Sequence, residues 1–224
     1  ADEVILTVGT TEGLGIVIKS IIDNNDHVII PTPGYVGYDP LISLENGKVV
    51  ELDVTETNNI ITVESLNKAY NSNVKCLIIT NPNNPTGKLY TIEEMTIIKD
   101  FVLDKDILLI ADEIYSDIVF EQDFVSFSTF KELKNNLVLL NGFSKSHAMT
   151  GFRIGYVISN LELINHFVKV HQYNVTSTST ISQYAALEAI DFTYQSMIDD
   201  LSIKRDLVLN KLDQLNIPYI PSQG

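Results

Sequence analysis

The alternation of short apolar runs with longer amphipathic segments constrains the fold of this chain more than any other feature of its sequence. Seven short runs are rich in aliphatic residues: Val4–Val8, His27–Ile30, Lys48–Leu52, Lys75–Thr80, Asp106–Ala111, Asn136–Leu140 and Ile154–Ser159. Between them lie segments of helical length: Thr11–Asn24, Tyr35–Leu44, Thr62–Asn71, Thr91–Leu103 and Leu161–Val170. Alternating strands and helices predict parallel β-strands covered by helices on both faces. The sequence therefore predicts an α/β fold.

Local signals agree with this assignment. Continuous apolar strings such as CLIIT, ILLIA and LVLL are typical of strands that are buried on both faces. Thr91 and Glu94 have the spacing of a capping box, which predicts that a helix begins there. The single cysteine, Cys76, lies inside an apolar run, so we interpret it as a small core residue.

The sequence changes character after Ser177, where long helical patterns cover Tyr184–Ile190 and Tyr194–Leu215. Ile217–Ile220 then has the pattern of a new strand. We therefore expect residues 1–195 to form one large domain. Residues 196–224 are expected to form a connecting helix and the start of a smaller C-terminal domain, so that the chain would be part of a longer protein.

Composition excludes several classes of partner. The formal net charge is −14, and no cluster of lysine and arginine offsets it, so nucleic acid and anionic membrane surfaces are not expected partners. No apolar stretch is long enough to span a bilayer, and no basic leader opens the sequence, which favours a cytoplasmic location. The histidines lack metal-ligand spacing, so no metal site is predicted.

Residues that can carry chemistry follow four of the apolar runs. In open parallel α/β sheets, ligands bind at the carboxyl ends of the strands. The four segments found there are Gly9–Gly13, Asn81–Gly87, Asp112–Tyr115 and Asn141–Lys145. They would bring an anion-binding turn, an amide-rich loop, an acid with a tyrosine, and a lysine to one edge of the sheet.

Each of these groups also has a purely structural interpretation. Thr10 and Thr11 at a helix N-terminus suit a phosphate, but the same residues are ordinary N-caps. Asp112 could keep a heterocyclic nitrogen protonated, or it could cap a helix or form a surface ion pair. Tyr115 could contact the same ligand or be a half-buried aromatic residue.

Lys145 and Arg153 extend this set. Most lysines are solvated, yet a lysine in a partly desolvated pocket can form a Schiff base. Arg153 lies between Gly151 and Gly155, where the backbone can approach closely and a guanidinium can bind phosphate oxygens, or it is a surface residue at a turn.

Together these segments resemble the class I/II aminotransferases among the fold-type I enzymes that depend on pyridoxal 5′-phosphate (PLP). The resemblance rests on the strings TVGTTEGLG, PTPGYVGYDP, NPNNPTG, ADEIYSDIVF and NGFSKSHAMTGFRIGY, and more weakly on HQYNVTSTSTISQYAALEA. It implies a three-layer α/β/α sandwich around a mostly parallel, seven-stranded mixed sheet. It also implies an enzyme that moves an amino group between an amino acid and a 2-oxo acid, and a homodimeric parent protein.

The resemblance assigns roles to individual residues. Lys145 would hold PLP through a Schiff base and then act as general acid and base. Asp112 would pair with the ring nitrogen, which strengthens the cofactor as an electron sink. Tyr115 and Asn84 would hydrogen-bond the phenolic oxygen of the ring, and Asn84 would also meet the substrate carboxylate.

The remaining roles concern the ring faces and the phosphate. Tyr35 and Ile114 would cover the two faces of the ring, and the phosphate would be held by Thr10, Thr11 and Arg153. One position departs from the family pattern, because many relatives have a serine where this chain has Gly142, and Ser144 or backbone groups would then replace it.

Two alternatives to the aminotransferase interpretation stay open at this point. A PLP-dependent β-lyase has nearly the same cofactor contacts, because the choice of reaction depends mostly on substrate contacts. An aminotransferase-like ligand-sensing domain of a transcription regulator is the second alternative. The family's arginine for the substrate carboxylate and its N-terminal closing segment are expected outside this chain, so the isolated chain is not expected to transaminate.

Overall fold

The computed structural model of the protein describes residues 2–224. Its centre is a seven-stranded mixed sheet with the strand order β1-β7-β6-β5-β4-β2-β3. The strands are β1 (Val4–Thr7), β2 (His27–Thr32), β3 (Lys48–Asp53), β4 (Val74–Thr80), β5 (Leu108–Asp112), β6 (Leu137–Gly142) and β7 (Gly155–Ile158). The helices are α1 (Gly9–Ile21), α2 (Tyr38–Leu44), α3 (Val63–Ala69), α4 (Ile92–Lys105), α5 (Leu161–Asn174), α6 (Thr180–Ala189) and α7 (Gln195–Gln214). All seven predicted strand regions are confirmed.

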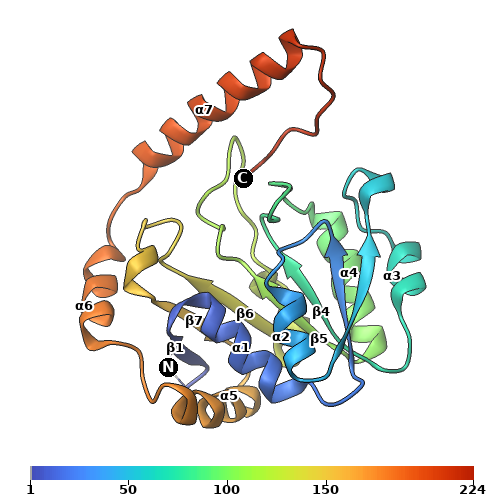
Figure 1. The fold of residues 1–224 in the computed structure, drawn as a ribbon, viewed down its shortest axis with the longest axis vertical. Coiled ribbons are helices and arrows are strands. Elements are labelled where there is room, and N and C mark those ends of the chain that lie inside the picture. Colours follow the sequence, from blue (N-terminus) through green and yellow to red (C-terminus); the bar gives the residue numbers. More distant parts are fainter. Residues whose placement is uncertain (1) are drawn as a thin grey trace.

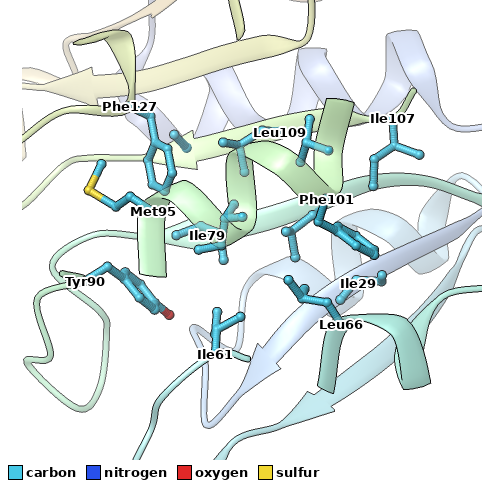
Figure 2. Packing of buried hydrophobic residues seen from close by; sticks show 14 of the residues in the cluster. Ile29, Ile61, Leu66, Ile79, Tyr90, Met95, Phe101, Ile107, Leu109 and Phe127 are labelled. Carbon is cyan, nitrogen blue, oxygen red and sulfur yellow. The ribbon is translucent and has the colours of Figure 1, made fainter. Parts of the chain in front are cut away.

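Helices cover both faces of the sheet, as predicted (Figure 1). On one face α1, α2 and α5 pack against the strands, in a cluster that includes the fully buried Cys76. On the other face α3 and α4 pack against them, where Met95 and Phe101 of α4 lie over Ile79 and Leu109 of the sheet (Figure 2). The capping box of α4 is present, since Thr91 accepts from the backbone of Glu94 and Glu94 from that of Thr91.

The direction of β7 sets the geometry of one end of the sheet. β7 runs antiparallel to both of its neighbours, β6 and β1. Parallel neighbours need a crossover connection, usually through a helix. The segment from residue 143 to 154, between β6 and β7, contains only a 3₁₀ turn at Thr150–Phe152, so the chain turns back alongside β6. The N-terminal end of β7 therefore lies beside the C-terminal ends of β6 and β1.

Two sequence predictions about elements are wrong. The helix expected from Tyr35 begins at Tyr38, because the ring of Pro40 clashes with the carbonyl of the residue four positions earlier and is tolerated only in the first helical turn. Ile217–Ile220 form no strand within the described chain. The tail instead lies along the loop after β4, where the N–H of Gln223 donates to the Gly87 carbonyl at 2.7 Å.

Helix α7 stands apart from the three layers (Figure 1). Ile198 is the residue of α7 that the core buries, among those described, whereas Ile203 and Leu207 are 68% and 69% exposed. None of the helices in residues 2–224 combines the length and apolarity needed to cross a membrane.

Candidate active site

A cleft of about 190 Å³ opens at the edge of the sheet where the parallel strands end. Each of the nine residues singled out from the sequence lies on its wall: Thr10, Thr11, Tyr35, Asn84, Asp112, Ile114, Tyr115, Lys145 and Arg153. They lie at or after the ends of β1, β2, β4, β5 and β6, or just before β7. Four further lining residues are Leu14, Thr80, Ser144 and Thr150. The chain thus brings together side chains that are up to 143 positions apart (153 − 10).

The antiparallel course of β7 explains the position of Arg153. This residue lies just before the strand, so its side chain reaches the edge at which the other strands end. Its backbone is left-handed, with φ of 51°, and its Nη1 donates to the Thr150 carbonyl at 2.9 Å. The guanidinium lies against Gly9, where any Cβ would clash with it. Gly9 itself has φ of 74°, so both this backbone conformation and the closeness of Arg153 favour a glycine there.

The first turn of α1 forms the wall beside Arg153. The N-cap residue is Val8, which makes no side-chain cap hydrogen bond, so Thr10 and Thr11 are not the caps that the structural alternative required. The hydroxyl of Thr10 donates to the Asn141 carbonyl at 3.3 Å, which ties this turn to the end of β6. Because the first N–H groups of a helix lack intrahelical partners, this turn and the guanidinium together suit an anion.

Asp112 is the last residue of β5 and is buried at the base of the cleft. Burial raises the pKa of its carboxyl to about 6, although hydrogen bonds from Tyr38 and Ile114 and the charge of Lys145 lower it. The N–H of Ile114 donates to Oδ1 at 3.3 Å. Asp112 is therefore neither a surface ion pair nor a helix cap. A buried carboxylate of this kind is stabilised by a cationic group placed against it.

Tyr38 is a residue of this site that sequence reasoning missed. Its hydroxyl donates to Oδ2 of Asp112 at 3.0 Å and also lies within hydrogen-bond distance of the Thr80 hydroxyl. Burial, and next the charge of Asp112, raise the pKa of Tyr38 well above its usual value, so the phenol stays protonated as a donor. The signal in the sequence was the second tyrosine of PTPGYVGY, three residues after Tyr35.

Lys145 follows β6 by three residues and faces Tyr115 across the cleft. The Lys145 Nζ lies 5.5 Å from the centroid of the Tyr115 ring. Asn84 Nδ2 donates to the Tyr115 hydroxyl at 3.4 Å, so the amide and the phenol present polar atoms to the same region. Tyr35 packs edge-on against Tyr38, with ring centroids 5.3 Å apart.

Gly142 explains why this chain departs from the family pattern at that position. A Cβ on Gly142 would lie 2.8 Å from the Cα of Gly155 and 2.9 Å from the Ile154 carbonyl oxygen, so a serine does not fit there without a backbone shift. Ser144 instead lies on the wall of the cleft. A hydroxyl is thus available two residues further along.

Comparison with known proteins agrees with this arrangement. Residues 1–224 match the family described as "Aminotransferase class I and II". The chain belongs to this family. It is 36% identical over 211 residues to a probable N-acetyl-LL-diaminopimelate aminotransferase of Bacillus subtilis, covering 94% of this chain and 52% of that protein. It is 34% identical to a probable aspartate aminotransferase of Methanocaldococcus jannaschii, covering 96% of this chain and 58% of that protein.

Solved structures of aminotransferases share the fold. The crystal structure of an aspartate aminotransferase from Thermotoga maritima superposes with a TM-score of 0.96 at 29% identity, over 100% of this chain and 60% of that chain. The three-layer α/β/α architecture predicted from the sequence is therefore confirmed. The chain spans between half and about three-fifths of the length of these relatives.

Proposed function

We propose that this chain is the cofactor-carrying part of a PLP-dependent aminotransferase, which moves an amino group between an amino acid and a 2-oxo acid. One observation carries the proposal: separate strand ends bring Lys145, the buried Asp112 and an anion cradle to a single cleft. Membership of the class I and II aminotransferase family supports this proposal, because the relatives compared above are named as aminotransferases.

The residues around the cleft fit PLP. The first turn of α1 and Arg153 offer N–H groups and positive charge for the phosphate, and Asp112 offers a buried carboxylate for a protonated ring nitrogen. Tyr35 and Ile114 supply apolar surface for the two ring faces. When bound, PLP supplies an electron sink for the electrons released at the substrate Cα.

The chain's own groups would do the remaining work. The amine of Lys145 takes a proton from the substrate Cα and returns one, since it opens onto the cleft beside Tyr115. Asn84 donates to the Tyr115 hydroxyl, and this pair would offer hydrogen bonds to the ring oxygen of the cofactor. Asp112 would hold the proton on the ring nitrogen, and the Tyr38 hydroxyl, which donates to Oδ2, holds the Asp112 carboxyl in place.

We further propose that residues 1–195 form the large domain and that residues 196–224 begin a smaller one, in a protein that is a homodimer. The exposed apolar residues of α7, including Ile203, Leu207 and Val208, support the first point because a second domain would cover them. Tyr173, 87% exposed on α5, and Ile181, 78% exposed on α6, support the second, because exposed apolar side chains of this kind would be covered by a partner subunit.

The proposal is tested on the full-length protein loaded with PLP. A panel of L-amino acids is incubated with a 2-oxo acid, and the new amino acid is measured alongside pyruvate and ammonia. We expect amino-group transfer that Lys145→Ala abolishes and that Lys131→Ala, at an exposed lysine outside the cleft, leaves intact. Release of pyruvate and ammonia without transfer would instead indicate a lyase.

A further inference from the structure

The first turn of α1 is tied to the end of α5 by a pair of side chains behind the cleft, Glu12 and His171. Glu12 Oε1 lies 3.1 Å from His171 Nδ1, and the two side chains are only 15% and 9% exposed. The described residues that line the cleft include neither of them. Any effect of the pair on the site is therefore transmitted through the backbone that it holds.

The second oxygen of Glu12 reaches that backbone directly. Glu12 Oε2 accepts the N–H of Val8, the N-cap residue of α1, at 3.1 Å. An ionised carboxylate only accepts hydrogen bonds, so His171 donates from Nδ1. The Glu12 side chain thus joins Val8 to His171 of α5, which lies 159 positions after Glu12 in the sequence.

In the sequence, Thr10 and Thr11 lie between Val8 and Glu12, the two residues that this hydrogen bond joins. The turn that holds them begins at Gly9, and the contacts of Glu12 with Val8 and His171 fix the backbone on both sides of the two threonines. An acid one turn away from an anion cradle opposes a phosphate electrostatically. Any benefit of Glu12 to phosphate binding must therefore come from the geometry that it holds and not from its charge.

We propose that Glu12 and His171 are positioning residues that fix the first turn of α1 in the shape that grips the phosphate of the cofactor. This inference rests on the proposed function, since it assumes that PLP occupies the cleft. It predicts that loss of the pair weakens binding of a phosphorylated ligand and leaves its unphosphorylated counterpart unaffected.

The test compares equilibrium affinities for PLP and for pyridoxal, which lacks the phosphate. His171→Leu should weaken PLP binding about fivefold, the factor that corresponds to the typical loss of a helix cap, with pyridoxal binding unchanged. His171→Asn should restore affinity, because its amide donates from near the position of Nδ1. His166→Leu is the matched control, since His166 is an exposed residue of the same helix.

Glu12→Ala provides a second variant that keeps the helix, because alanine is the best helix former. It should give the same loss for PLP alone, and the double variant should add nothing further, as expected for two groups that act as one unit. Equal losses for PLP and pyridoxal, or no loss for either, would overturn the inference. A wild-type protein that binds neither ligand at Lys145 would instead overturn the proposed function, and this inference with it.

Discussion

Replacing Asp112 with asparagine removes a carboxyl group whose pKa burial raises to about 6. The same group in an unfolded chain has a pKa of about 3.9. Because the folded value is the higher one, the carboxyl contributes stability that is full below the unfolded pKa and is lost as the pH rises through the folded one. A shift of about two units corresponds to a loss of about 3 kcal/mol once both states are ionised.

About half of this loss falls between roughly pH 5 and pH 8. Across that window the free energy of unfolding of the cofactor-free Asp112→Asn protein should therefore rise by about 1.5 kcal/mol relative to that of the wild type. Asparagine fits the site sterically. Its Oδ1 can accept from Ile114, while its amide can donate to Tyr38, whose hydroxyl can then donate to Thr80. The pH-independent cost of the exchange cancels in the difference between the two pH values.

Urea unfolding of both cofactor-free proteins at a series of pH values measures this difference. Asp53→Asn is the matched control, because Asp53 also ends a strand of the sheet but is exposed, and hydrogen bonds from Thr55 lower its pKa. That control should give a flat difference over the same window, since Asp53 titrates below it. A flat difference for Asp112→Asn as well would refute the account of Asp112 as a buried carboxyl that needs a cationic partner.

Two further substitutions test the surroundings of the site, and a third tests a nearly buried ion pair of α4. Tyr38→Phe should raise the pKa of Asp112 further and destabilise the cofactor-free protein by about 1.5–3 kcal/mol once the carboxyl is ionised, which urea unfolding above and below that pKa can check. Gly142→Ser should cost about 1–3 kcal/mol, because its Cβ would lie 2.8 Å from the Cα of Gly155; an unchanged Tm would contradict this. Glu94→Ala should lower the free energy of unfolding by about 3–5 kcal/mol, since it leaves Lys88, whose Nζ lies 3.0 Å from Glu94 Oε1, without a counter-charge. Denaturant midpoints measure this loss, and a value below about 1 kcal/mol would show that the ion pair is weak.

The sheet and much of the cleft could be predicted because local patterns encode them. Buried parallel strands leave continuous apolar strings, and ligand-binding residues of such sheets follow the strands. Asp112 and Lys145 were found in this way, one at the end of β5 and one three residues past β6. The agreement thus follows from a general property of α/β sheets.

What could not be predicted depends on tertiary context. The apolar pattern of β7 carries no strand direction, so the reason for the position of Arg153 became clear only from the antiparallel pairing. Tyr38 was missed because its role depends on where α2 begins, which Pro40 shifts by three residues from the expected start. A tyrosine in a turn and a tyrosine that hydrogen-bonds a buried carboxyl have the same local sequence signal.

Covalent trapping of the cofactor tests the central claim most directly. The purified protein is incubated with PLP, reduced with borohydride and digested, and the modified peptides are mapped by mass spectrometry beside a Lys145→Ala control. The account predicts one dominant phosphopyridoxyl group, on Lys145, which the control lacks. Equal labelling of surface lysines in both proteins, with Lys145 no more modified than the others, would contradict the assignment of this cleft as a PLP site.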